Sequence, residues 1–214
     1  MLDIGPGRTV VDLAAGTGKL TRLLLPTGAR LIAVEPMPGM RAELARTLPG
    51  VDVSDGTAEQ MALADDSVDA VVVAQAFHWF DGERALPEIH RVLAPGGGLA
   101  MVWNVRDRTV EWVERLTQIM DRHCAGVPRY RSGEWKRAFE AGTLFGPLEF
   151  RCYPFDHEVD ADTIMDRVRS TSWIAVLAEA ERGPLLDEVR ALFDGMPDRF
   201  PAPYHTELWW TRAR

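Results

Sequence analysis

A carboxylate followed by a glycine-rich turn is the first feature of this chain that could do chemistry. Asp12 lies in the apolar run Val10–Leu13, and small residues with two glycines follow at Ala14–Gly18. A helical pattern begins directly afterwards, at Lys19. Such a turn lets a ligand approach backbone that carries no side chains, and the free N–H groups of the helix face that ligand. We therefore expect a buried strand, a tight turn and a helix N-terminus that bind a small molecule.

The spacing of the small residues separates two classes of cofactor. Nicotinamide and flavin dinucleotides bind at GxGxxG, but Thr21 stands where that pattern needs its third glycine. S-adenosylmethionine sites instead use an acidic residue followed by GxGxG. Asp12 would repel a pyrophosphate, whereas it can accept a hydrogen bond from an ammonium group or hold the turn. The sequence thus favours S-adenosylmethionine over NAD.

A second carboxylate follows the next apolar run. Glu35 comes after Leu31–Val34, and Met37 lies just beyond it. A carboxylate at such a strand end can accept hydrogen bonds from both ribose hydroxyls, although this feature alone does not separate S-adenosylmethionine from NAD. Met37 can pack on one face of adenine. The alternatives are a surface carboxylate for Glu35 and core packing for Met37.

The elements that position these residues alternate between strand and helix. The expected strands are Thr9–Leu13, Leu31–Val34, Val51–Ser54, Val68–Ala74, Leu99–Trp103, Leu148–Val159 and Tyr204–Thr211. The expected helices are Lys19–Leu25, Pro38–Leu48, Asp81–Leu93, Val110–Cys124, Asp160–Ser170 and Arg182–Phe193, with a helical turn at Ala58–Leu63 and a stop at Ala94–Gly98. This order predicts an α/β fold with a doubly wound parallel sheet. Ligands bind outside the carboxyl ends of such strands, where Asp12 and Glu35 fall.

Length, charge and cysteine content limit the function classes. The 214 residues predict one domain, 1–214, with a cofactor-binding half (1–107) and a half that supplies substrate-side helices and the last two strands (108–214). A net charge of −8 argues against a nucleic-acid partner. No run approaches the ~20 apolar residues of a membrane span, and the start lacks a signal-peptide pattern, so we expect a soluble, cytoplasmic protein. Cys124 and Cys152 lack metal-ligand spacing, so we expect no metal site and place both cysteines in core or half-buried positions.

Several motifs stand in an order that resembles a known family. They are Val11–Gly18, Val34–Pro36, Gly56–Glu59, Ala74–Phe80 and Glu88–Gly97. Together they resemble class I S-adenosylmethionine-dependent methyltransferases with a type 11 methyltransferase domain, and within it the trans-aconitate-methyltransferase-like branch. The strong match covers about residues 8–107.

The resemblance implies a fold, a cofactor and a set of site residues. The fold is a Rossmann-like sheet of about seven strands, mostly parallel with an antiparallel last strand, and helices on both faces. The cofactor is S-adenosyl-L-methionine, with S-adenosyl-L-homocysteine as product. The implied cofactor-binding residues are Asp12, Ala14, Ala15, Gly16, Thr17, Gly18, Glu35, Pro36, Met37, Gly56, Thr57, Ala58, Glu59, Ala74, Gln75, Ala76 and Trp79. The substrate side comprises Phe77, His78, Trp103, Asn104 and Arg106.

Two of these residues depart from the family pattern. Ala14 replaces its first glycine, and the added methyl group is tolerable if φ is negative there. Thr57 stands where many relatives carry an Asp that binds the adenine amine. The adenine contact then depends on the Thr57 hydroxyl or on a backbone carbonyl.

Methyl transfer from a sulfonium needs alignment of the reactants and exclusion of water. A general base helps if the nucleophile starts protonated, and His78 is the candidate because it titrates near neutrality. Alternatively, His78 only forms a hydrogen bond to cofactor or backbone. Arg106 suits a carboxylate substrate, or it pairs with Asp107 or another neighbour.

The expected function is methyl transfer to oxygen, nitrogen or carbon of a small molecule, by a monomer or homodimer. The rivals are a protein that holds the cofactor without turnover and, less favoured, an NAD-dependent oxidoreductase. About eight residues precede Thr9, whereas the resembled family has a helical cover there. We therefore expect either a truncated chain or a cover from the 110–180 region or a second subunit.

Overall fold

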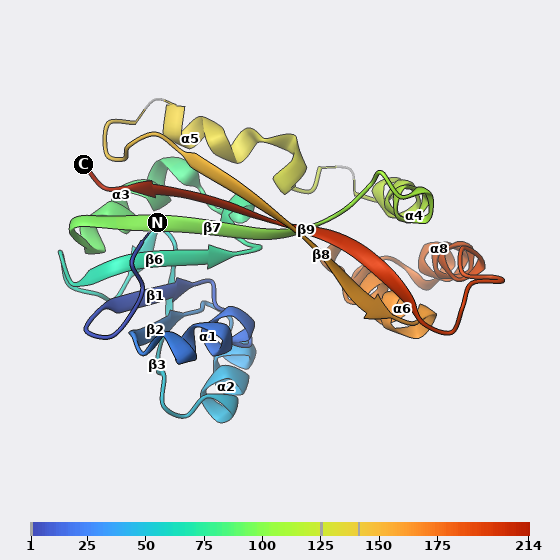
Figure 1. Cartoon of the computed structure of the whole chain (residues 1–214), viewed down its shortest axis with the longest axis horizontal. Helices are drawn as coiled ribbons and strands as arrows, with labels where there is room; N and C mark the ends of the chain where they lie inside the picture. The colour runs from blue at the N-terminus through green and yellow to red at the C-terminus, as the bar shows by residue number, and fades with distance from the viewer. Residues whose placement is uncertain (1, 125, 141) are drawn as a thin grey trace. The chain divides into compact units, whose positions relative to one another are not determined.

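The computed structural model describes residues 2–124, 126–140 and 142–214 (Figure 1). Its elements follow one another in this order: β1 (Thr9–Leu13), α1 (Lys19–Leu24), η1 (Leu25–Thr27), β2 (Arg30–Val34), α2 (Pro38–Thr47), β3 (Asp52–Ser54), β4 (Gly56–Thr57), β5 (Gln60–Met61), β6 (Val68–Ala74), η2 (Phe77–Trp79), α3 (Gly82–Val92), β7 (Leu93–Arg106), α4 (Glu111–Asp121), η3 (Tyr130–Ser132), η4 (Glu134–Lys136), α5 (Arg137–Glu140), β8 (Glu149–Val159), α6 (Ala161–Arg169), α7 (Ser172–Ala175), α8 (Glu179–Ala191) and β9 (Phe200–Arg212). The η segments are short 3-10 helices.

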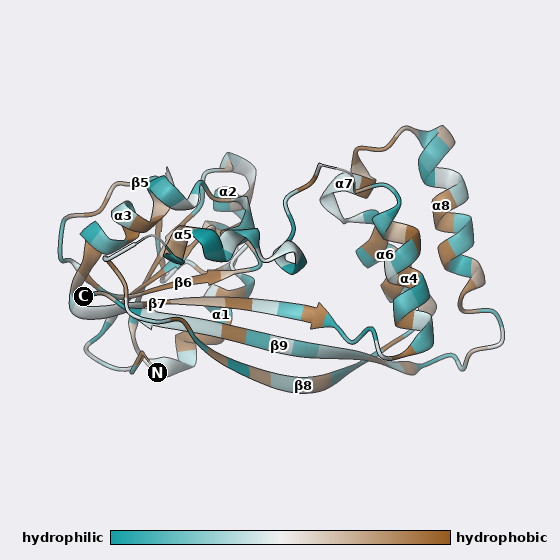
Figure 2. Ribbon diagram, turned by 90° about the horizontal axis from the view of Figure 1, so that it is seen from above, coloured by the Kyte–Doolittle hydropathy of each residue, from teal (hydrophilic) through white to brown (hydrophobic). Residues whose placement is uncertain are grey.

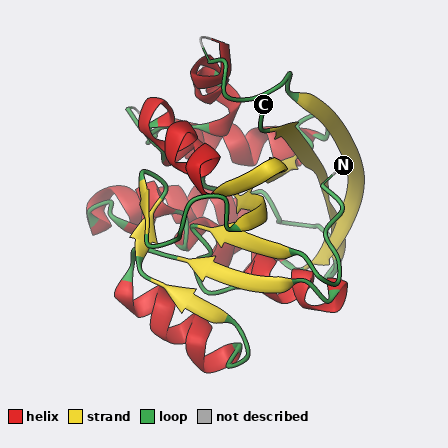
Figure 3. Cartoon of the chain, turned by 90° about the vertical axis from the view of Figure 1, so that its left-hand side faces the viewer, coloured by secondary structure: helices red, strands yellow, loops and turns green. Residues whose placement is uncertain are grey.

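Within the described residues, seven strands form one sheet in the order β3-β2-β1-β6-β7-β9-β8. β1 pairs in parallel with β2 and β6, and β6 pairs in parallel with β7. The last strand runs antiparallel to β7, since the N–H of Ala213 donates to Gly97 and the N–H of Asp107 donates to Pro203. Helices lie on both sides of the strands (Figure 3). The predicted Rossmann-like sheet with an antiparallel last strand is therefore confirmed.

The central strands are almost entirely buried, as parallel strands covered on both faces must be. β6 has the sequence VDAVVVA, and it is coloured as hydrophobic over most of its length in Figure 2. Helices α1 and α2 cover one face, where Leu20 and Leu44 pack with Val10 and Leu31. The β-branched valines favour the strand, and the helix leucines supply the area that stabilises the layers.

The strand register places the candidate site at one edge of this sheet. Leu13 lies opposite Val34, and Val34 lies opposite Ser54. Ala74 lies opposite Val102. Chain order reverses between β1 and β6, which makes this edge the topological switch point where such sheets bind ligands.

The described residues group into two compact units. The first comprises residues within 1–103, 128–151 and 207–214, and the second comprises residues within 104–127 and 152–206. In the second unit, Leu116 of α4, Ile164 of α6 and Val189 of α8 share one apolar core. The single domain divided at residue 107 remains a prediction. No helix in the described ranges combines the length and the apolar character of a membrane span.

The helical turn predicted at Ala58–Leu63 is wrong. β4 and β5 form an antiparallel hairpin there, with Gly56 opposite Met61. The Met61 N–H donates to Glu88 Oε1 at 2.6 Å, and Arg91 Nη1 donates to the Leu63 carbonyl at 2.9 Å. These bonds to α3 hold the segment as a hairpin, because tertiary partners override a weak local helix preference.

The predicted end of the helix before Ala94–Gly98 agrees with the end of α3 at Val92, whereas the predicted turn is part of β7, which already begins at Leu93. A Cβ built on Gly98 would lie 2.5 Å from Leu2 Cδ2 and 2.7 Å from the Thr211 carbonyl oxygen. The glycine therefore permits close strand packing rather than a turn. Helix α8 begins at Glu179, before the predicted start at Arg182, and it contains Gly183 and Pro184.

One side-chain environment differs from the expectation. Cys152 is exposed on β8, at the edge of the sheet, whereas Cys124 is buried as expected. An edge strand has a neighbour on one side only, so residues along it keep more contact with water.

Candidate active site

The turn after β1 has three left-handed residues. The φ angles of Ala14, Gly16 and Gly18 are +56°, +59° and +81°. The Ala15 N–H donates to the Val34 carbonyl at 3.1 Å, which ties the turn to β2. The expectation of a negative φ at Ala14 is wrong, so this alanine carries strain of about 1–2 kcal/mol that a glycine would avoid. Such strain persists where surrounding structure enforces it, and it is typical of ligand sites.

Asp12, before the turn, is hydrogen-bonded to helix α1, after the turn. It is 1% exposed, and Thr21 Oγ1 donates to its Oδ2 at 2.5 Å. Burial raises the pKa of Asp12 to about 6, and the hydrogen bonds from Thr21 partly offset that rise. Thr21 thus has a role that its place in a glycine pattern did not reveal. The signal was a buried strand-end acid followed by a hydroxyl in the next helix.

Glu35 links the ends of β1 and β2. Its Oε2 accepts the Gly16 N–H and its Oε1 accepts the Met37 N–H, each at 2.9 Å. Glu35 is 4% exposed. A carboxylate has about four lone-pair positions, so each oxygen can accept one further hydrogen bond. Among the described residues no further donor bonds to the Glu35 carboxylate, so it is a buried acceptor with two unused positions beside the turn.

Arg41, which the sequence did not single out, braces this loop. Its Nη1 donates to the carbonyls of Glu35 and Pro36 at 2.8 and 2.6 Å, and to Asp55 Oδ1 at 2.9 Å. Met37, which follows Pro36, has an exposed side chain. The signal was an arginine one helical turn after a strand-end carboxylate.

The β4–β5 hairpin supplies the residues expected around adenine. Thr57 is exposed, Ala58 is buried, and Glu59 Oε1 accepts the Asp81 N–H at 3.1 Å. A Cβ built on Gly56 would lie 3.0 Å from Val34 Cγ1, so this glycine lets the hairpin approach β2 closely.

The segment after β6 contains a second strained residue. Gln75 has a φ of +60°, and its N–H donates to the Val102 carbonyl at 2.8 Å. Ala76 then accepts the Trp79 N–H at 2.8 Å, which closes the short helix η2. Trp79 is 49% exposed, so its indole offers an apolar surface to a ligand. Phe77 is buried and packs on Phe139 with ring centroids 5.4 Å apart.

His78 bonds to the end of β7. Trp103 Nε1 donates to His78 Nδ1 at 3.2 Å. Burial lowers the pKa of His78 to about 4, in contrast to the near-neutral titration expected from the sequence. An imidazole with so low a pKa is a weak general base at neutral pH.

Trp103 is 1% exposed and belongs to an aromatic cluster, so it cannot itself touch a substrate in this arrangement. Its ring stacks on Tyr130 with centroids 4.3 Å apart, and Trp135 lies at 4.9 Å. The Tyr130 hydroxyl donates to the Glu207 carboxylate, and burial and this bond raise the pKa of Tyr130. These partners come from distant segments, so sequence spacing did not predict them.

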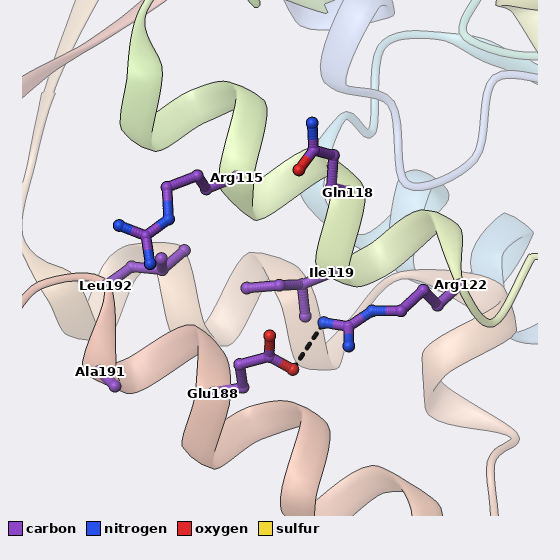
Figure 4. Close-up of a pocket in the computed structure, with 7 residues that line it drawn as sticks. All are labelled: Arg115, Gln118, Ile119, Arg122, Glu188, Ala191 and Leu192. Carbon is purple, nitrogen blue, oxygen red and sulfur yellow. Dashed lines mark hydrogen bonds and ion pairs between the residues drawn. The ribbon is translucent and has the colours of Figure 1, made fainter.

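Two predicted substrate residues belong to the second unit. Asn104 Oδ1 accepts a hydrogen bond from Thr206 Oγ1 at 2.8 Å. Arg106 lines a small cavity with Trp112 and Tyr204. A separate groove of about 460 Å³ lies between α4 and α8, where Arg122 pairs with Glu188 at 2.5 Å (Figure 4). The described structure therefore gathers the cofactor set, Phe77, His78 and Trp103 in the first unit.

Comparisons with known proteins assign this arrangement to a family. A family model described as "Methyltransferase domain" matches residues 11–101 of this chain. A methyltransferase-like protein of Schizosaccharomyces pombe is 37% identical over 199 residues, which cover 92% of this chain and 76% of that protein. The chain belongs to the class I methyltransferases. Methyl transfer is the reaction class of this family.

Two further methyltransferase comparisons agree. An uncharacterized methyltransferase of Mycobacterium tuberculosis is 52% identical over 115 residues, which cover 54% of this chain and 47% of that protein. The chain thus matches about half the length of the mycobacterial methyltransferase. A structure from Anaeromyxobacter dehalogenans, provisionally described as a type II methyltransferase, has a TM-score of 0.73 at 24% identity and covers 100% of this chain and 93% of its own. That likeness shows the class I methyltransferase fold; the trans-aconitate branch stays a prediction.

Proposed function

We propose that this methyltransferase binds S-adenosyl-L-methionine at the carboxyl edge of β1, β2 and β6 and transfers its methyl group to a small molecule. One observation carries the proposal: Glu35 is buried, bonded to the Gly16 and Met37 amides, and still has two acceptor positions. The two hydroxyls of a ribose match those positions in number and in hydrogen-bonding character.

The residues present fit such a cofactor. Around Gly16, the nearest atom to a built Cβ is Met40 Sδ at 4.0 Å, so there is room for a ligand against the backbone. Met37, Met40 and Trp79 are exposed apolar side chains, which suit an adenine ring and an aliphatic chain. The negative charge of the ionised Asp12 carboxylate lies close to the turn, which favours a cationic group there and disfavours a pyrophosphate.

When bound, S-adenosylmethionine supplies a methyl group that is already activated. Glu35 then orients the ribose, and the turn Ala14–Gly18 offers amides and carbonyls to the amino-acid end. Thr57, Ala58 and Glu59 flank adenine. Gln75, His78 and Trp79 border the side where the acceptor arrives and help to exclude water. Asn104 and Arg106 are proposed as substrate contacts.

Calorimetric titration with S-adenosylmethionine tests the binding step. We expect saturable binding by the unaltered chain and at least tenfold weaker binding by Glu35→Gln, which replaces an acceptor oxygen with a donor. Glu43→Gln is the matched control, because Glu43 is an exposed helix carboxylate paired only with Arg46. NAD serves as the counter-ligand. Heat from NAD and none from S-adenosylmethionine would reverse the choice of cofactor.

Transfer from methyl-labelled S-adenosylmethionine separates an enzyme from a protein that only holds the cofactor. The acceptors are pools of small molecules with oxygen, nitrogen or carbon nucleophiles, and the readout is S-adenosylhomocysteine with label in an extracted product. Binding without any transfer would favour the cofactor-holding alternative. The net charge of −8 leads us to expect no transfer to DNA or RNA. We further propose a monomer or homodimer, which gel filtration with light scattering distinguishes.

A further inference from the structure

The two ring nitrogens of His78 differ in their surroundings. Nδ1 accepts the indole N–H of Trp103 at 3.2 Å. An indole nitrogen donates only, so Nδ1 must present its lone pair and carry no proton. In neutral imidazole the proton then sits on Nε2. Trp103 thus selects one of the two neutral tautomers.

The other nitrogen remains available. Throughout residues 2–124, 126–140 and 142–214, no protein group forms a hydrogen bond with His78 Nε2. Nε2 is also absent from the buried polar atoms without a partner, which within those residues comprise Trp173 Nε1 alone. The Nε2–H of His78 is therefore a donor that water or a ligand can reach.

The donor of this bond is held firmly. Trp103 stacks on Tyr130 at 4.3 Å with an interplanar angle of 24°, and it lies 4.9 Å from Trp135. Trp135 Nε1 donates to the Tyr130 carbonyl at 3.2 Å, so the neighbouring rings are themselves anchored. A buried ring in such a stack cannot rotate its N–H away from His78 without disturbing the cluster.

The place of His78 makes the donor useful. His78 follows the end of β6, and Trp103 lies in β7 directly after Val102, which pairs with Ala74. Both residues are therefore at the edge where β1 and β2 present the Gly16 turn and Glu35. The Trp79 ring lies 5.3 Å from that of His78 and is half exposed. A ligand that stacks on Trp79 therefore lies close to the His78 ring.

We propose that Trp103 is a positioning residue that locks His78 in the Nε2–H tautomer, and that His78 thereby donates a hydrogen bond to a ligand oxygen instead of acting as general base. The oxygen belongs to a carboxylate or carbonyl of the methyl acceptor, or to the carboxylate of the cofactor. This inference rests on the proposed function for the identity of the ligand, whereas the tautomer itself does not depend on it.

Nitrogen NMR of protein labelled with ¹⁵N-histidine tests the tautomer. We expect a protonated Nε2 and an unprotonated Nδ1 for His78 from pH 5 to 8, with no titration step near pH 6.5. Trp103→Phe removes the N–H that fixes the tautomer, so it should shift the Nδ1 signal and allow the Nδ1–H tautomer to form. Trp209→Phe is the matched control, since Trp209 Nε1 donates to the Tyr130 hydroxyl at 2.9 Å and not to His78. A neutral His78 that carries its proton on Nδ1 in the unaltered protein overturns the proposal, even if Trp103→Phe fails to fold.

Two ligand arms identify the oxygen. S-adenosylhomocysteine carries a carboxylate, and 5′-methylthioadenosine lacks it. A shift of the Nε2–H signal with the former alone assigns the oxygen to the cofactor. A shift only when benzoate is added to the S-adenosylhomocysteine complex assigns it to the acceptor side. If S-adenosylhomocysteine binds and no arm shifts the signal, the donor role is refuted; if it does not bind, the proposed cofactor fails while the tautomer result stands.

Two substitutions of His78 by side chains that do not titrate distinguish a hydrogen-bond donor from a general base. His78→Gln places an amide N–H near the position of Nε2, whereas His78→Asn can replace only the Nδ1 side. We expect the ligand that shifts the Nε2–H signal to bind His78→Gln within about threefold of the unaltered protein, and His78→Asn about tenfold more weakly. Equal weakening in both variants would count against the donor role.

Discussion

Two residues of the candidate site have a strained backbone; among the described residues, Asp3 and Asp66 are the other non-glycine residues with a positive φ. Ala14 and Gln75 adopt left-handed φ angles of +56° and +60°, and they follow the adjacent strands β1 and β6. Non-glycine residues avoid this conformation by about 1–2 kcal/mol. Hydrogen bonds to neighbouring strands enforce the left-handed conformation. The N–H of Ala15, next to Ala14, donates to the Val34 carbonyl, and the N–H of Gln75 donates to the Val102 carbonyl.

Relief of this strain should stabilise the protein. Ala14→Gly is expected to raise the free energy of unfolding by about 0.5–1 kcal/mol, because the gain in φ freedom exceeds the entropy lost on ordering glycine. Urea denaturation measures the change. Ala15→Gly is the matched control and should lower the free energy of unfolding, since Ala15 is buried and has no positive φ. A fall for both variants would show that Ala14 is unstrained.

Asp12 should make stability depend on pH. Its folded pKa of about 6 lies above the ordinary 3.8, so the folded chain binds the proton more tightly than the unfolded chain. That stabilisation is complete below about pH 4 and is lost as pH rises through 6, at a cost of about 3 kcal/mol. The stability of Asp12→Asn relative to the unaltered protein should therefore increase by about this amount from pH 4 to 7.

Urea denaturation across this pH range checks the Asp12 prediction. Asp198→Asn, on an exposed loop, is the control and should show a flat difference. A flat difference for Asp12→Asn as well would mean that the buried carboxyl has an ordinary pKa.

At the scale of elements, ionic groups on α3 decide the form of the neighbouring segment. Glu88 Oε1 accepts the Met61 N–H, and Arg91 pairs with Glu88 at 2.7 Å. The hydrogen bond from Arg91 lowers the pKa of Glu88, and the bond from the Met61 amide and the charge of Arg91 add to that effect. A short hairpin such as β4–β5 is not stable alone, so α3 supplies its order.

Glu88→Gln should loosen the hairpin. We expect the free energy of unfolding to fall by about 1–2 kcal/mol, because a charged hydrogen bond to Arg91 becomes a neutral one. Hydrogen exchange at the Met61 amide should accelerate more than global unfolding explains. The control is Glu83→Gln, on the exposed side of α3. Unchanged exchange at Met61 would show that the hairpin holds itself.

At the scale of the molecule, every residue proposed to hold the cofactor belongs to the first compact unit. A ligand that binds only the folded chain stabilises it by about 2.7 kcal/mol at one hundred times Kd. The second unit has its own apolar core of Leu116, Ile164 and Val189. Because each unit has its own core, a ligand bound to the first unit can slow local unfolding there without slowing it in the second unit.

Hydrogen exchange with and without S-adenosylmethionine should show this difference. We expect slower exchange at residues 12–18 and 35–37 and little change in α6 and α8. The measurement needs no knowledge of the methyl acceptor. Equal slowing in α8 would place part of the cofactor site in the second unit, and no slowing anywhere would contradict binding.

Local patterns were sufficient to predict the parallel sheet and to place the candidate site residues at one edge of it. The apolar runs Thr9–Leu13 and Val68–Ala74 are strands with the predicted bounds, because both are buried from both faces and no polar alternative competes. Carboxyl ends of parallel strands share an edge, so the positions of Asp12, Glu35 and Ala74 followed from strand order alone.

Contacts between distant segments determined the rest. The hairpin at Gly56–Met61 depends on Glu88 and Arg91, and the tautomer of His78 depends on Trp103. The pKa of Asp12 depends on its burial by residues that are distant in the sequence, so a local sequence pattern does not predict it. Secondary structure in central strands follows local burial patterns, whereas protonation, strain and hydrogen-bond partners depend on which distant groups surround a residue. The sequence therefore predicted a candidate site, whereas the tertiary fold determined the strain, protonation and hydrogen-bond partners of its residues.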